Sequence, residues 1–200
     1  MCKADSRSGF VNLGNPKQIW AIPAIHSAAQ DLACLHDNIL KHIKPGDRVV
    51  YLGNYTGYGD NAIACINEIL AFRRMVLSIR GIIPSDIVYL KGMQEEMLSK
   101  LMQLQFASNA SDVLLWMLGN GLNATLSDYD ISPHDGIEAC RRGIMDITRW
   151  TQKIRSNIRV HAGHEDFMVS QKRAAYTCVD KNTSPLLFVH AGINTGKELH

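Results

Sequence analysis

Three strand-like segments, each followed by a glycine-containing loop or turn and then a helix-like segment, constrain the fold of this chain most strongly. The segments at 18–22, 48–52 and 86–91 are short and apolar, and 48–52 is the clearest because it is β-branched and aromatic. The segments that follow the first two place apolar residues at helical spacing: Leu32, Leu35, Ile39 and Ile43, then Ile63, Ile66 and Leu70. Ser27 is expected to cap the first of these helices. Repeated strand–loop–helix units predict an α/β fold in which helices flank a mixed β-sheet.

The middle of the chain interrupts this alternation. Residues 107–158 carry helical patterns at 111–118 and 137–154, joined by a polar, turn-rich link at 127–135. We therefore expect a helical insertion that packs beside the sheet as a cap, after which 186–190 returns as a strand. The chain is expected to form one domain over 1–200, with 1–16 flexible.

Composition excludes several partner classes. The formal net charge is +2 and there is no basic run, so neither nucleic acid nor an anionic membrane surface is an expected partner. No stretch approaches the roughly 20 apolar residues that span a bilayer. The five cysteines are widely spaced without a C-x-x-C pair, which argues against structural zinc and favours a reducing, cytoplasmic location. Cys34, Cys65 and Cys140 fall within predicted helices, where buried and inert thiols are expected.

Four short motifs follow the predicted strands. They are Pro-Ala-Ile-His-Ser at 23–27, Gly-Asn-Tyr-Thr-Gly-Tyr-Gly at 53–59, Gly-Met-Gln-Glu at 92–95 and Val-His-Ala-Gly at 189–192. In α/β sheets, ligands bind where the carboxyl ends of strands, loops and helix N-termini converge. The four motifs are therefore expected to form one site.

With their order and spacing, these motifs resemble the calcineurin-like metallophosphoesterases, close to the branch of Ser/Thr protein phosphatases and bacterial dinucleoside tetraphosphatases. In that family the first three motifs are G-D-x-H-G, G-D-Y-x-D-R-G and G-N-H-E. The resemblance covers about 19–100 and 186–194, and it implies a metallophosphoesterase-like sheet core flanked by helices. It also implies a further G-H-T segment that is missing before His200, which leaves open whether the C-terminal part of the family fold is absent.

The resemblance implies a degenerate metal site. Ala24 stands where the first metal-binding Asp is expected, Asn54 where an Asp bridges two ions, and Met93 where an Asn ligand is expected. Gln94 replaces the general-acid His, and Tyr58 stands where a phosphate-binding Arg is expected.

The metal ligands that remain, His26, Asn54 and His190, are all neutral. Two divalent ions a few ångströms apart repel strongly, so such a pair requires anionic ligands. No cofactor is therefore expected, and the alternative is one divalent ion, manganese, iron or zinc, on the two histidines.

Further candidate residues surround this set. The candidate ligand-binding residues are Glu95, Gln94, Tyr58 and Arg48, although a helix cap explains Glu95 better than catalysis does. The helix N-termini that follow Gly59 and Gly92 are expected to favour an anion. His161 and His164 are expected to cap a helix or to lie on the surface.

Three functions remain open from the sequence. The first is an inactive or strongly impaired metallophosphoesterase-like protein that binds a protein partner or a phosphorylated ligand. The second is an active phosphatase or nucleotide phosphohydrolase, a hydrolase of phosphoric esters or anhydrides with an atypical single-metal site. The third is a structural oligomer in which the helical insertion forms the interface.

Overall fold

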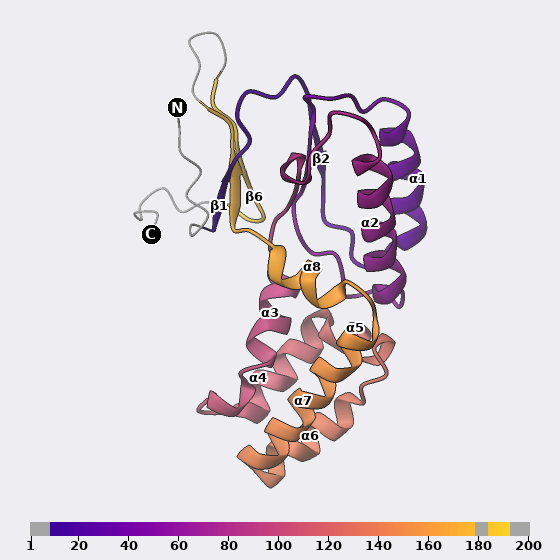
Figure 1. Cartoon of the computed structure of the whole chain (residues 1–200). Helices are drawn as coiled ribbons and strands as arrows, with labels where there is room; N and C mark the ends of the chain where they lie inside the picture. The colour runs from indigo at the N-terminus through magenta and orange to yellow at the C-terminus, as the bar shows by residue number, and fades with distance from the viewer. Residues whose placement is uncertain (1–8, 179–183, 193–200) are drawn as a thin grey trace.

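Two small β-sheets lie in the upper part of Figure 1, in the computed structural model, which describes residues 9–178 and 184–192. Strands β2 (Ile19–Ile22), β3 (Arg48–Tyr51) and β4 (Ile87–Tyr89) pair in parallel in the order β2-β3-β4. Strands β1 (Phe10–Asn12), β5 (Ala174–Tyr176) and β6 (Leu187–Val189) form the second sheet in the order β1-β5-β6, with β6 antiparallel to β5. A single bridge between Leu90 and Lys172 links the sheets.

Successive side chains of β3 and β4 alternate between two separate hydrophobic cores. Val49 and Tyr51 belong to the large core shared with the helices, whereas Val50 packs with Val88 and with Ala175 of the second sheet. Successive side chains of a strand point to opposite faces. Because both faces are covered, these strands appear in the sequence as continuous apolar runs.

Helices α1 (Ala29–Leu40) and α2 (Ala62–Leu77) lie together beside the β2-β3-β4 sheet (Figure 1). A buried histidine joins all three elements. His36 of α1 is fully buried, its Nδ1–H donates to Glu68 of α2 at 2.6 Å, and its Nε2 accepts from the Tyr51 hydroxyl at 2.8 Å. The imidazole also stacks on Phe72, with ring centroids 3.9 Å apart.

The remaining helices form a lobe below the sheets in Figure 1. In chain order they are α3 (Met93–Leu101), the 3₁₀ turn η2 (Leu104–Phe106), α4 (Ala110–Met117), the π-helical turn η3 (Leu118–Leu122), α5 (Asn123–Asp128), α6 (Pro133–Arg142), α7 (Ile144–Val160) and α8 (His164–Ser170). Another 3₁₀ turn, η1 (Pro84–Asp86), precedes β4. In the described part of the chain, no helix combines the length and apolar character of a membrane span.

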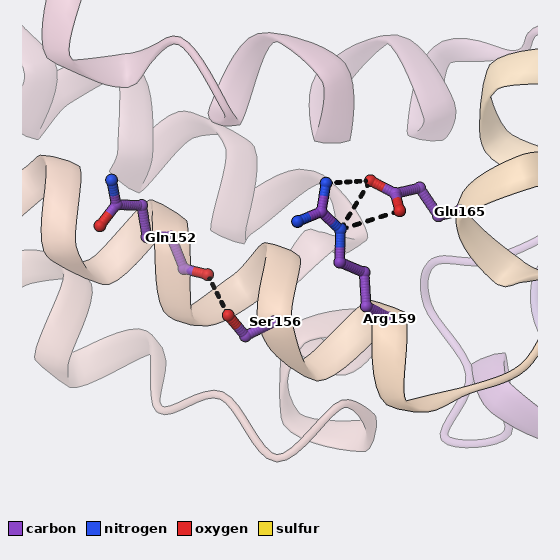
Figure 2. A network of polar contacts seen from close by, with 4 residues as sticks. All are labelled: Gln152, Ser156, Arg159 and Glu165. Carbon is purple, nitrogen blue, oxygen red and sulfur yellow. Dashed lines mark hydrogen bonds and ion pairs between the residues drawn. The ribbon is translucent and has the colours of Figure 1, made fainter.

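A bidentate ion pair fixes α8 against α7. The Arg159 guanidinium contacts both carboxylate oxygens of Glu165 at 2.8–2.9 Å, as Figure 2 shows, next to a hydrogen bond from Ser156 to the carbonyl of Gln152. At the start of α8, His164 is fully buried between Tyr129 and Asn67. The expectation of a surface or capping role for His164 is therefore wrong.

The α/β prediction, with helices flanking a small sheet, is confirmed, but three local expectations fail. Residues 10–12 form β1 and Leu13 is buried, although 1–16 was expected to be flexible; residues 1–8 lie outside the described residues. Ser27 does not cap α1, because Ala28 is the N-cap and makes no side-chain cap bond. Cys34 is exposed, whereas Cys65 is buried and Cys140 is half-buried.

A candidate site at the strand ends

The loops after β2 and β3 are joined by backbone hydrogen bonds. The N–H groups of Ile25 and His26 both donate to the carbonyl of Asn54, each at 2.9 Å. The N–H of Ser27 donates to the carbonyl of Tyr55 at 2.9 Å. The first two motifs therefore form one structural unit at the carboxyl ends of their strands.

The third motif holds this unit through the Glu95 carboxylate. It accepts hydrogen bonds from the backbone N–H groups of Asn54 at 2.8 Å, Tyr55 at 3.0 Å and Gly92 at 2.9 Å. Burial raises the pKa of Glu95, and the N–H donors oppose that shift. The structure thus uses Glu95 as a helix cap and as a clamp on the second motif.

The fourth motif reaches the same loops through His190. The Nδ1–H of His190 donates to the carbonyl of Leu52 at 2.8 Å, which makes Nε2 the acceptor nitrogen of the neutral ring. Leu52 lies two residues before Asn54, so His190 contacts the end of the strand that leads into the second motif, while backbone bonds join His26 to Asn54. We call His26, Ser27, Asn54, Tyr58, Gln94 and His190 the strand-end site.

The strand-end site concentrates backbone strain. Among the described residues, five non-glycine residues have positive φ, and four are His26 (48°), Ser27 (64°), Asn54 (55°) and Tyr58 (63°). Left-handed backbone is unfavourable for residues with a Cβ, and such strain gathers at functional sites. This local cost indicates that the loop conformation itself is required.

Two glycines allow the loops to approach so closely. A Cβ on Gly92 would lie 2.3 Å from the backbone nitrogen of Asn54. A Cβ on Gly57 would lie 2.4 Å from the side chain of Gln94, and Gly57 also has a φ of +89°. A larger residue at Gly92 would push against backbone, and one at Gly57 would displace the Gln94 side chain.

Three polar atoms of the strand-end site are buried without a hydrogen-bond partner: His26 Nδ1, Ser27 Oγ and Gln94 Oε1. Buried polar atoms are normally paired, so each such atom requires an explanation. Tyr58 lies beside them, since its ring meets the His26 ring edge-on with centroids 5.3 Å apart and its surface is 58% exposed.

The helical lobe is bonded directly to the strand-end site. The Gln94 amide donates to the carbonyl of Asn120 at 2.8 Å, and the N–H of Gly57 donates to Thr125 Oγ1 at 3.0 Å. These contacts come from the π-helical turn η3 and from α5, so this part of the lobe partly covers the carboxyl ends of the strands.

The structure gives evidence against two expectations about anion binding. Arg48 is the first residue of β3, at the opposite end from Asn54, and it pairs with Asp86 at 2.9 Å. The helix N-termini are already occupied by side chains of the chain itself. Glu95 and Asn54 Oδ1 accept N–H groups at the start of α3, and Asp128 accepts the N–H of Ile63 at 2.6 Å at the start of α2.

The donor set does not fit a pair of divalent ions. His26, Asn54 and His190 carry no negative charge, the Asn54 amide oxygen already accepts the N–H of Gln94 at 3.0 Å, and the Glu95 oxygens are taken by three backbone N–H groups. Within residues 9–178 and 184–192, no group of three or more His, Cys, Asp or Glu side chains is arranged to hold a metal ion. A single ion is compatible with His190, because metal-binding histidines usually donate their other ring N–H to a carbonyl or carboxylate.

Comparison with protein-family models and comparison with curated proteins both gave no match for this chain. The resemblance to the metallophosphoesterases therefore remains an expectation from the four motifs.

Proposed function

We propose that this chain is a metallophosphoesterase-like protein that has lost metal-dependent hydrolysis, or retains it only weakly, and that it acts by binding a protein partner at the strand-end site. The observation that carries this proposal is the hydrogen bonding of the Glu95 carboxylate. It is the one carboxylate within the four motifs, and three backbone N–H groups occupy its oxygens. The four motifs therefore offer no free carboxylate to offset two dications.

The backbone of the loops supports the family resemblance. Ser27 stands where the first motif of the family has glycine, and its φ is +64°, a conformation that glycine adopts without strain. Asn54 and Tyr58 keep similar left-handed conformations in the second motif. The left-handed backbone at Ser27 is therefore compatible with a glycine at that position of the family motif, whereas the side chains of these loops are unsuited to the metal chemistry.

A protein partner is favoured over a phosphorylated ligand at this site. The N-termini of α2 and α3, which would bind a phosphate group, are capped internally. In contrast, Tyr58 is 58% exposed and Trp116 of α4 is 55% exposed. The Trp116 carbonyl accepts from the Asn120 amide, and the N–H of Tyr58 donates to the carbonyl of Gly121 at 3.4 Å. The segment that follows Trp116 therefore contacts the loop that carries Tyr58. Exposed Tyr and Trp are typical anchors of protein interfaces.

Photo-crosslinking tests the binding half of the proposal. A photoreactive amino acid at position 58 is compared with one at position 145, because Met145 of α7 is similarly exposed, at 67%, and lies away from the site. The proposal expects a discrete partner crosslinked from position 58 and not from position 145. Equal crosslinking from both positions, or crosslinking only to a second copy of this chain, contradicts it.

Hydrolysis of p-nitrophenyl phosphate in manganese tests the other half. We expect wild-type protein to be inactive or nearly so. The double variant Ala24→Asp, Asn54→Asp restores the two carboxylates that the resemblance implies, and we expect it to gain activity. Ala24 is exposed, and an Asp at 54 keeps an acceptor for the N–H of Gln94, so both changes fit the structure.

One observation favours a second candidate, an active phosphatase with a single metal ion. The Nδ1–H of His190 donates to Leu52, which presents Nε2 as a ligand, and His26 Nδ1 has no partner. This candidate expects stoichiometric metal and measurable hydrolysis in the wild type, and the loss of both in His190→Ala.

A further inference from the structure

We propose that this chain has a second binding site, for a small uncharged molecule with an aromatic ring, in a cavity between α3, α7 and α8. The cavity measures about 410 Å³, within the usual range for small-molecule pockets. None of its lining residues belongs to the strand-end site, so the two sites share no side chain. We call it the α3–α8 cavity.

The α3–α8 cavity reaches the large hydrophobic core. Its lining includes five residues of that core, each no more than 7% exposed: Tyr55, Ile66, Leu98, Ile158 and Phe167. They come from the loop after β3 and from α2, α3, α7 and α8, so the cavity lies where these segments meet. Apolar walls of this kind are poorly solvated and favour an apolar occupant.

Two methionines give the cavity an adaptable wall. Met102, the C-cap residue of α3, and Met168 of α8 both line the cavity and are partly buried. The unbranched methionine side chain adjusts to the shape of a ligand, and its sulfur makes favourable contacts with aromatic rings. An aromatic ring is therefore the group that these walls accommodate best.

The two acidic residues in the lining already have partners. Glu165 accepts from Arg159 in the bidentate pair of Figure 2. The oxygens of Glu95 accept from three backbone N–H groups. A cationic ligand would have to compete with these bonds, so the cavity does not favour a positive charge.

The two cationic residues in the lining are engaged as well. Lys91 pairs with Glu96 at 3.0 Å. Arg155 donates to the carbonyl of Met102 at 3.3 Å. It also lies near Glu165, whose pKa is lowered by the hydrogen bond from Arg159 and further by the charge of Arg155. An anionic ligand would disturb these contacts, so an uncharged ligand fits the cavity better than an ion of either sign.

Two residues supply hydroxyl groups to the same lining, Thr56 of the second motif and Ser99 of α3. Within residues 9–178 and 184–192, neither side chain makes a hydrogen bond. Small-molecule sites usually combine apolar walls with a few polar groups that orient the ligand. A ring that carries one hydroxyl therefore matches the lining.

Isothermal titration calorimetry with 2-naphthalenemethanol tests the proposal, with 2-naphthoate and 2-naphthylmethylammonium as comparison ligands. The three probes share one ring system and differ in the charge of the attached group. We expect wild-type protein to bind the alcohol about fivefold more tightly than either ion, because each ion must lose water at walls whose charges are already paired.

The NMR signals of the methionine methyl groups report where the alcohol binds. We expect the signals of Met102 and Met168 to shift during the titration, because both side chains line the cavity. Met75 of α2 and Met145 of α7 are exposed and do not line it, so their signals should stay unchanged.

Ser99→Trp fills the cavity from its exposed side. Ser99 lines the cavity but is itself exposed, so the variant is expected to keep the thermal stability of the wild type. Its affinity for the alcohol is expected to fall roughly tenfold or more, because the new ring occupies the space of the ligand. Lys100→Trp is the matched control, since Lys100 is the next residue of α3, is exposed and does not line the cavity. It is expected to bind like the wild type.

Four results would overturn the proposal. They are no binding of the alcohol by wild-type protein at millimolar concentration, binding of either ion as tight as that of the alcohol, shifts confined to methionines outside the cavity, and equal affinity of wild type and Ser99→Trp.

Discussion

The Glu95 carboxylate lies 2.8 Å from the backbone nitrogen of Asn54 and accepts its hydrogen bond. This contact joins the third motif to the second across 41 positions of the sequence. With the bonds from Tyr55 and Gly92, it also occupies the oxygens of the one carboxylate in the four motifs, which therefore does not serve as a metal ligand. The same bond therefore organises the strand-end site and limits what that site can bind.

Glu95→Ala should cost the protein about 3 kcal/mol or more of unfolding free energy, because it leaves three buried N–H groups without their acceptor. Urea denaturation measures the change. Glu96→Ala is the control on the same helix, since Glu96 makes exposed ion pairs with Lys91 and Lys100 and should cost less than about 1 kcal/mol. Similar losses for both variants would show that Glu95 is not the clamp described above.

Ser27→Gly should stabilise the protein by roughly 1 kcal/mol. The change relieves a left-handed residue and removes a buried hydroxyl that has no partner. Ser99→Gly is the comparison, because Ser99 lies within α3, where glycine should instead destabilise by about 0.5 kcal/mol. Differential scanning calorimetry gives the sign of both changes, and a destabilised Ser27→Gly would contradict the strain argument.

The sequence predicted the elements whose signals are local. Strands β2, β3, β4 and β6 and helices α1, α2, α3 and α7 have apolar runs or helical spacing of their own. Strands β1 and β5 were missed because they pair with each other, as Phe10 does with Ala174, and these residues are far apart in the chain. The division into two sheets was missed for the same reason.

The site was predicted in part. The motifs correctly indicated which loops come together, since strand ends of a parallel sheet share one edge. Arg48 was predicted near the site because it is close to Asn54 in sequence. Strand β3 separates the two residues and places them at opposite ends. The bonds from Asn120 and Thr125 were missed, because no pattern in 107–158 indicates which turn of the lobe faces the strands.

Acid should destabilise the protein through His164. Burial, followed by the nearby His161, lowers the pKa of His164 from 6.5 to about 4. Its neutral ring accepts from the Tyr129 hydroxyl at 2.6 Å and donates to Asn67 at 3.0 Å. The unfolded chain binds this proton more readily, so stability is full above pH 6.5 and falls as the pH drops toward 4, by up to roughly 3 kcal/mol.

NMR titration of the imidazole signals should give the His164 pKa directly in the folded protein. Denaturation at several pH values then compares His164→Gln, expected to lose most of the added acid sensitivity, with His134→Gln, expected to keep it. His134 is exposed on α6 and makes a suitable control. A ring that titrates near 6.5 in the folded state would contradict this prediction.

Gly92→Ala should strongly destabilise the protein, by about 3 kcal/mol, because its Cβ would lie 2.3 Å from the backbone of Asn54. Gly119→Ala is the control, as nothing lies within 4 Å of a Cβ at that position. We expect Gly119→Ala to be neutral or slightly stabilising. The midpoints of thermal unfolding of the two variants are compared. A drop for Gly92→Ala alone shows that the contact between the motifs is tight, whereas a drop for both shows that glycine is needed at each position for another reason.

Manganese content after equilibrium dialysis, measured by inductively coupled plasma mass spectrometry, tests the central claim most directly. The neutral set of His26, Asn54 and His190 predicts substoichiometric manganese in the wild type and an increase in the Ala24→Asp, Asn54→Asp variant. Two tightly held manganese ions per wild-type chain, lost in His190→Ala, would contradict the account.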